Sequence, residues 1–144
     1  MAITVPELLK MSQTELDDLF KKSDPGPIPD GAAEGTAIIA PGTVYSHEIA
    51  KLVNLFAWQG KTFDGKHGVL RNRILAIGLN AIVAEVYKGP SWLDGKECIV
   101  LDYSKTSLVA QWIRDEIRQV GPKTYLGKVY WDKKRLIDFA LQFE

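Results

Sequence analysis

ECIVLDYS (Glu97–Ser104), KTSLVAQWIRDEIRQV (Lys105–Val120) and GPKTYLGKVYW (Gly121–Trp131) follow one another and hold two of the four tryptophans. The first segment contains a continuous apolar run, from Cys98 to Leu101, and its β-branched members favour an extended backbone. A run of this kind is typical of a strand that is covered on both faces. We therefore predict a central strand here, followed by a helix and then another strand.

The helix is predicted over residues 106–120. Its apolar residues recur at the spacing of a helix that lies on a core, and they are Leu108, Val109, Trp112, Ile113, Ile117 and Val120. Ser104 or Thr106 can cap the start, while Gly121 and Pro122 mark the end. The charged residues between them are then expected on the solvated side of the helix, namely Arg114, Asp115, Glu116 and Arg118.

The N-terminal region is predicted to be helical over residues 1–22. Thr4 with Glu7 and Ser12 with Glu15 each match the capping-box pattern, so two short helices are expected. Residues 23–34 form a connector, because the prolines and glycines of SDPGPIPDG interrupt regular structure. Residues 35–144 then form a single domain, whose first strand is expected at residues 35–40, and residues 46–56 favour a further helix.

The remaining chain alternates between short strands and turns. Hairpins are predicted between residues 57–64 and 69–77, between 81–87 and 97–103, and between the final strands at 125–131 and 136–143. Strands joined in this way make an antiparallel sheet, and curling hides its edges. We expect a mostly β (α+β) fold with an antiparallel β-barrel or half-barrel; the alternative is an α+β roll wrapped around the helix at 106–120.

Composition excludes several classes of protein. The 144 residues carry 18 basic and 18 acidic side chains, so there is no net charge, and no basic stripe for a nucleic acid. Cys98 is the single cysteine, and its apolar strand favours a buried thiol. We find no metal-ligand spacing, phosphate loop or nucleophile elbow, and expect neither metal nor cofactor. No apolar segment is long enough to span a membrane, and no secretory signal is recognised, so a cytoplasmic protein is expected. We expect it to be a monomer or a homodimer.

Aromatic residues are the main candidates for a ligand site. These candidates are Trp58, Tyr87, Trp92, Trp112 and Tyr125. They could line a cavity, in which their hydroxyl and indole N–H groups bond a ligand, or they could simply fill the core. Arg71 and Arg73 lie in an otherwise apolar strand, where exposure, an internal ion pair and recognition of an anionic ligand are all open.

Asp102 is the best candidate for an acid or base, with Tyr103 beside it. If Asp102 points inward, burial raises the pKa of its carboxyl group and suits it to proton transfer. The alternative is that Asp102 only ends the strand before the helix.

Five segments, GPIPDG, GKTFD, LRNRI, GPSWLDGKECIVLDYS and YLGKVYW, resemble an uncharacterised family of small bacterial proteins that is similar to lipocalin-like, calycin-type barrels. The resemblance spans about residues 16–144 and transfers no catalytic residue. GTAIIAPG (residues 35–42) stands where a lipocalin carries its Gly-x-Trp element. The resemblance implies that a small apolar molecule binds inside the barrel.

Three functions therefore stand as hypotheses. The first is binding of a small hydrophobic or aromatic, lipid-like molecule that can carry an anionic group. The second is a cofactor-independent isomerase or hydrolase that uses Asp102. The third is a structural or interaction module whose N-terminal helices dock on a partner.

Overall fold

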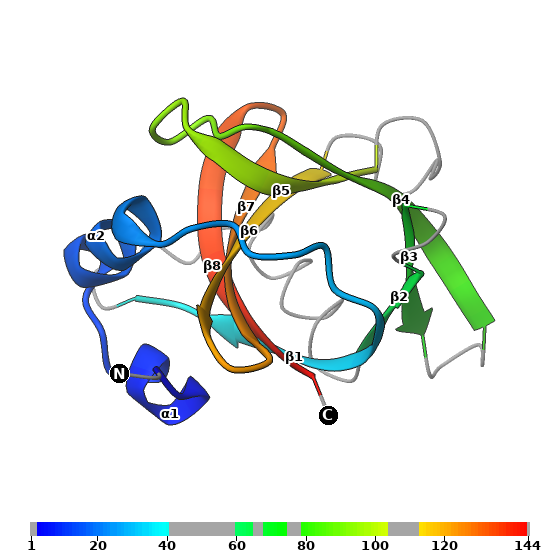
Figure 1. The fold of residues 1–144 in the computed structure, drawn as a ribbon, viewed down its shortest axis with the longest axis horizontal. Helices are drawn as coiled ribbons and strands as arrows, with labels where there is room; N and C mark the ends of the chain where they lie inside the picture. The colour runs from blue at the N-terminus through cyan, green and yellow to red at the C-terminus, as the bar shows by residue number, and fades with distance from the viewer. Residues whose placement is uncertain (1–2, 41–59, 65–67, 75–78, 104–112, 144) are drawn as a thin grey trace.

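The computed structural model describes residues 3–40, 60–64, 68–74, 79–103 and 113–143. Within these residues the chain forms two helices followed by eight strands (Figure 1): α1 (Val5–Leu9), α2 (Gln13–Lys22), β1 (Gly31–Ile38), β2 (Gly60–Asp64), β3 (Val69–Ile74), β4 (Leu79–Pro90), β5 (Glu97–Asp102), β6 (Ile113–Gly121), β7 (Thr124–Trp131) and β8 (Lys134–Phe143). The helix expected at residues 46–56 lies outside the described residues.

The two N-terminal helices are confirmed, and their caps are those that the sequence predicts. Thr4 and Ser12 each accept a hydrogen bond from the backbone of the glutamate three residues later, and that glutamate reaches back to the cap. Each capping box supplies partners for amides that a helix N-terminus otherwise leaves unbonded. Neither helix is long and apolar enough to cross a membrane, and the same is true of the other residues that the structure describes.

The sheet is antiparallel throughout, as predicted, so the mostly β architecture with short N-terminal helices is confirmed. Consecutive strands are hydrogen-bonded to each other from β1 to β8. β1 also pairs with β8, in a register that sets Gly35 opposite Leu141, so the order of strands closes as a barrel. All three predicted hairpins are present.

The predicted helix at 106–120 is wrong for residues 113–120, which belong to β6. Ile113 pairs with Trp131 and Ile117 with Gly127, in register with β7. Apolar residues four apart satisfy a helical spacing, but they also satisfy the two-residue period of a strand. The antiparallel pairing with β5 and β7 decides between the two periods. Residues 104–112 lie outside the described part of the chain.

The first strand begins earlier than predicted, at Gly31 instead of residue 35. Ala32 pairs with β2, and Ala33 and Glu34 pair with both β2 and β8, so the connector ends at residue 30. Gly31 takes a φ of 91°, a backbone conformation that side chains with a Cβ rarely adopt. The prolines and glycines of SDPGPIPDG predicted a connector up to residue 34, whereas pairing with neighbouring strands makes residues 31–34 part of β1.

Alternate residues of the strands pack into two separate apolar clusters. The inner cluster fills the barrel and includes Ile99, Leu101, Ile117, Val129, Phe139 and Leu141. The outer cluster lies between the sheet and the helices, and it joins Leu8, Leu16, Leu19 and Phe20 to Cys98, Val100, Leu126 and Ala140. Figure 1 shows both helices on the same side of the molecule, away from β2 and β3. Strands β5, β7 and β8 are therefore covered on both faces.

Candidate functional site

Two polar side chains meet on the inner face of the barrel. Tyr103 directly follows β5, and Asp115 lies on β6 between Ile113 and Ile117, which both belong to the inner cluster. Tyr103 is 3% exposed and Asp115 is 1% exposed. The Tyr103 hydroxyl donates to Asp115 Oδ2 across 3.5 Å, which is the long limit for a hydrogen bond. The pair places a carboxyl group and a phenol beside apolar residues of the inner cluster.

The connector contacts the opposite end of the barrel. The Tyr125 hydroxyl donates to the carbonyl of Pro27 across 2.9 Å, and the backbone N–H of Gln119 donates to the carbonyl of Pro25 across 3.3 Å. Ile28 packs against the inner cluster. Figure 1 shows this segment, in light blue, crossing the sheet between α2 and β1.

Asp115 lies away from the end that the connector contacts. It precedes Gln119 by four residues on β6, which corresponds to about 13 Å along a strand. A molecule inside the barrel near Asp115 and Tyr103 would therefore not compete with the connector. We take the Asp115–Tyr103 end as the candidate site.

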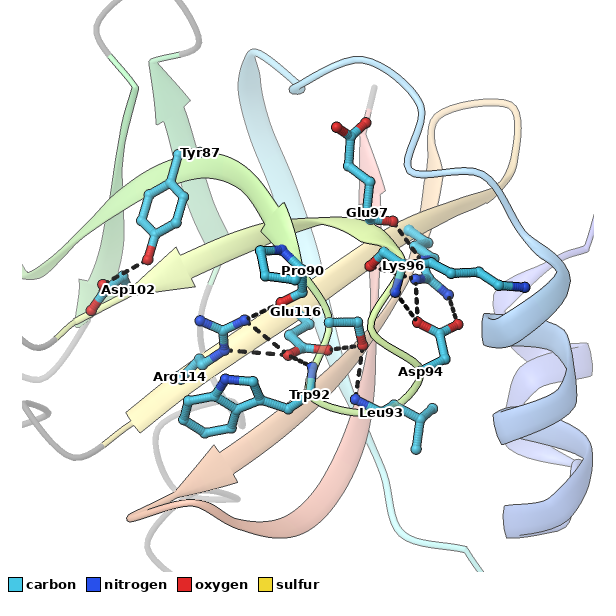
Figure 2. A network of polar contacts seen from close by, with 12 residues as sticks. Tyr87, Pro90, Trp92, Leu93, Asp94, Lys96, Glu97, Asp102, Arg114 and Glu116 are labelled. Atoms are coloured by element: carbon cyan, nitrogen blue, oxygen red, sulfur yellow. Dashed lines mark hydrogen bonds and ion pairs between the residues drawn. The ribbon is translucent and has the colours of Figure 1, made fainter.

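The structure separates the predicted pair Asp102 and Tyr103. Asp102 shares the face of Val100, outside the barrel, and accepts a hydrogen bond of 2.9 Å from the Tyr87 hydroxyl (Figure 2). Burial of Tyr87, and then its hydrogen bond to Asp102, raise the pKa of the tyrosine above its ordinary value. Tyr87 is nevertheless 37% exposed. Tyr103 finds its carboxylate on β6 instead.

Trp92 also lies outside the barrel, with 48% of its surface exposed. Its ring packs edge-on against Tyr130, at 5.1 Å between centroids. The Arg114 guanidinium lies 4.3 Å from the centroid of the Trp92 ring (Figure 2). The same guanidinium donates to Glu116 and to the carbonyl of Pro90. These contacts fix the loop between β4 and β5 on the outer face of the barrel.

Glu116 is the buried centre of this loop network, although it was predicted to be solvated. Its carboxylate accepts from the Ser91 hydroxyl at 2.6 Å, the Trp92 backbone at 2.7 Å and Arg114 at 3.1 Å. Arg118 is buried as well, and its guanidinium makes two hydrogen bonds of 2.8 Å to Asp94. Charges on this face are paired because the loop and α2 exclude water from them.

The other predicted ligand residues divide between described and undescribed parts. Tyr125 is inside the barrel, 3% exposed, against Phe143 at a centroid distance of 5.6 Å. Arg71 and Arg73 both belong to β3. The backbone of Arg71 pairs with that of Thr62 on β2 and that of Val83 on β4. Trp58 and Trp112 lie outside the described residues.

Cys98 is fully buried in the outer cluster, as its apolar strand predicted. Burial raises the pKa of its thiol to about 12, so the thiolate that acts as nucleophile or metal ligand is unfavourable at neutral pH. Within the described ranges no group of three or more histidine, cysteine or acidic residues is arranged to hold a metal ion.

Sequence reasoning missed Asp115 because the helical prediction placed it in solvent. The signal was present: Ile113, Asp115 and Ile117 alternate with Arg114, Glu116 and Arg118 at the period of a strand. The charged residue in the apolar half of that alternation is the one that the fold brings to Tyr103.

Comparison with known proteins supports the fold alone. No family model matches the chain, and no curated protein matches it at a significant level. A crystal structure described as a protein from Thermomonospora curvata is similar, with a TM-score of 0.63 and 17% sequence identity, covering 93% of this chain and 88% of that one. The fold class that this similarity supports is a small antiparallel β fold with short helices.

Proposed function

We propose that the protein binds a small, mostly apolar or aromatic molecule inside a lipocalin-like barrel, at the end marked by Asp115 and Tyr103. The observation that carries the proposal is the placement of a carboxyl group and a phenol among inner apolar residues, more than 95% removed from solvent. Small-molecule sites are mostly apolar, with a few polar groups that orient the ligand.

A carboxyl group at this position disfavours a role in packing alone. Burying a carboxylate costs free energy that an apolar residue between Ile113 and Ile117 would avoid. Natural sequences depart from local packing rules chiefly at functional or strained sites. Asp115 therefore points to recognition.

The polar pair also limits the chemistry of the ligand. Asp115 can accept a hydrogen bond from a hydroxyl or amine, and a carboxylate repels a neighbouring anion. We therefore propose a hydrogen-bond donor as the group that reaches this end. An anionic group held by Arg71 or Arg73 remains the prediction from the sequence, and it would have to lie away from Asp115.

The test begins with native mass spectrometry of protein purified from its own host, followed by extraction of any bound molecule. Binding is then measured with N-phenylnaphthylamine, a neutral apolar fluorophore with one N–H donor. Asp115→Asn should weaken its binding roughly 10- to 100-fold, the effect of losing a hydrogen bond to a charged group. Asp102→Asn is the matched control on the outer face, and should leave binding unchanged.

Two results would contradict the proposal. If Asp115→Asn and Asp102→Asn bind the fluorophore equally to the wild type, Asp115 does not orient a ligand. If the fluorophore binds with unchanged affinity when Tyr103→Trp narrows the site, it binds elsewhere on the molecule.

A cofactor-independent enzyme is the second candidate, and the contact between Asp115 and Tyr103 favours it. A buried carboxyl group beside a phenol can pass a proton to or from a bound substrate. In this version Asp115 replaces Asp102 as the acid or base, because Asp102 faces outward. Conversion of the extracted molecule by the wild type, lost in Asp115→Asn while binding persists, would favour the enzyme over a binding protein.

A further inference from the structure

Helix α2 is held on the barrel by a buried group of charges. Lys128 of β7 is fully buried, and its Nζ lies 2.6 Å from Asp17 Oδ1 and 2.7 Å from Asp138 Oδ2. Arg135 reaches the same oxygen of Asp17 across 2.9 Å. Gln13, one turn before Asp17, donates to Asp17 and to Asp138. Asp17 thus joins the helix to both β7 and β8.

This group is balanced in charge, with two cations and two carboxylates. Burial acts to raise the pKa of Asp17, but Lys128, Gln13 and Arg135 together outweigh it, so the pKa lies below its ordinary value. Burial raises the pKa of Asp138 above its ordinary value, although Lys128 opposes the rise. Removing one member of a buried pair leaves the other without compensation, which costs far more than a surface ion pair.

The C-terminal end of α2 has a second attachment. Arg118 of β6 donates to the carbonyl of Phe20 across 2.7 Å, where a helix leaves its last carbonyls unbonded. The guanidinium also lies 4.4 Å from the centroid of the Phe20 ring. Phe20 is fully buried, so both its backbone and its side chain are fixed to the sheet.

The connector continues directly from this end of α2 into the barrel. Pro25, Pro27 and Pro29 have no N–H to donate, so residues 23–30 cannot form a strand ladder of their own. Ser23 is bonded back to the carbonyls of Leu19 and Phe20 in α2, and further along the connector the Gln119 N–H donates to the Pro25 carbonyl and the Tyr125 hydroxyl to the Pro27 carbonyl. The connector is thus tied to α2 at its first residue and to β6 and β7 further along.

We infer that α2 and the connector act as a latched plug: the charge group of Asp17, Lys128, Arg135 and Asp138 holds α2 on the sheet, and α2 in turn holds the connector in the end of the barrel. Release of α2 withdraws the connector and opens that end. The role of this opening in ligand entry and exit rests on the proposed binding function. The mechanical coupling of α2 to the connector does not rest on that function.

The test uses Asp17→Lys, which sets a cation against Lys128 and Arg135 and leaves the pairing of Lys128 with Asp138 on the sheet. Asp18→Lys is the matched control, because Asp18 is the next residue of α2, is exposed and undergoes the same change of charge. Hydrogen exchange is measured by mass spectrometry in the full-length protein. Asp17→Asn serves as a milder variant if the reversal prevents folding.

In Asp17→Lys the amides of α2 and of residues 23–30 should exchange together, on the order of a hundredfold faster than in the wild type, while β5 to β8 keep their protection. Asp18→Lys should exchange like the wild type. Faster exchange in α2 with an unchanged connector would overturn the plug, and unchanged exchange in both would overturn the latch.

Release of N-phenylnaphthylamine, followed by stopped flow, tests the link to the barrel. We expect dissociation about tenfold faster from Asp17→Lys than from Asp18→Lys, because the plug is open for more of the time. An equal rate would show that ligands do not use this end. If the wild type binds no fluorophore, the proposed function fails, whereas hydrogen exchange still decides whether the latch exists.

Discussion

The two faces of strands β5 to β8 solve the problem of burial in different ways. Along β7 and β8 the inner face carries Val129, Ile137, Phe139 and Leu141, and these pack as apolar groups alone. The outer face of the same strands carries Lys128 and Asp138, which are no less buried. Along β7 and β8, therefore, the inner face needs only apolar packing, whereas the outer face needs a partner for every buried charge.

The difference shows how each face depends on the rest of the chain. The inner face is completed by closure of the sheet, with Ile28 of the connector packed against it. The outer face is completed only when α2 and the loop at 91–96 bring Asp17, Phe20 and Asp94 to it. We therefore expect the outer face to open locally and the inner face to open only with the whole fold.

The largest effect on stability should come from removing a large buried side chain from each face in turn. Phe139→Ala and Phe20→Ala each remove a fully buried ring, which typically costs about 3 to 5 kcal/mol. Chemical denaturation should show the full loss for Phe139→Ala as a lower midpoint with an unchanged slope. For Phe20→Ala, hydrogen exchange should show the loss first in α2. Equal protection losses in both variants would mean that the two faces unfold as one unit.

A smaller effect on stability is expected from adding a side-chain atom to the packed inner face. Gly127 faces Phe139 across the pairing of β7 with β8, and a Cβ at Gly127 would overlap the outer edge of the Phe139 ring. Gly127→Ala should lower the free energy of unfolding by about 1 to 3 kcal/mol, the usual cost of overpacking. In the background of Phe139→Leu the same change should cost less, which a thermal-denaturation double-mutant cycle measures. An additive result would place the strain elsewhere.

The pH dependence of the outer face should follow Asp94. The hydrogen bond from Arg118 holds the pKa of Asp94 below its ordinary value of 3.8, so the folded protein binds this proton more weakly than the unfolded chain does. Asp94 therefore stabilises the fold fully above that ordinary value, and the contribution is lost as the pH falls through the lowered one. Asp94→Asn should cost about 1 to 2 kcal/mol near neutral pH.

The difference in the free energy of unfolding between Asp94→Asn and the wild type should disappear on acidification. Urea unfolding at a series of pH values would measure it. A difference that stays constant below the ordinary pKa of Asp94 would contradict the linkage. Asp132→Asn, in the exposed turn between β7 and β8, is the control for a general change of charge.

The smallest effect is expected where the outer face meets solvent. Trp92→Leu removes the ring beside Arg114 but keeps the backbone N–H that Glu116 binds, so the loss should be about 0.5 to 1 kcal/mol, as for an exposed cation–π pair. Thermal denaturation of Trp92→Leu and Trp92→Phe should rank the phenylalanine variant closer to the wild type. A loss as large as that of Phe20→Ala would mean that Trp92 anchors the loop.

Local rules were sufficient for the helices and the hairpins. The capping boxes at Thr4 and Ser12 depend on residues only three apart, so α1 and α2 follow from the sequence. The turn between β7 and β8 is likewise local: Asp132 and Lys133 adopt φ angles of 48° and 70°, which match the twist of a two-residue hairpin. The inward alternation of Ile137, Phe139, Leu141 and Phe143 in β8 was also readable, because polar or small residues separate them.

The site depended on contacts between distant segments. Leu16, Leu19 and Phe20 of α2 cover the outer face of the sheet, so charged residues there are buried although the sequence around them resembles a wetted surface. Asp115 and Tyr103 meet because β5 and β6 pair side by side, and that pairing could not be read from either segment.

The sequence by itself determined the caps, the turns and the alternation of the clearest strands, because these are set by interactions within a few residues. The tertiary structure decided that residues 113–121 are a strand, that Asp102 faces outward while Asp115 faces inward, and that Lys128 is buried. The physical reason is the same in each case: a residue's side chain is inside or outside only with respect to the segments that pack on it. For β6 those segments include α2, about 100 residues earlier in the chain.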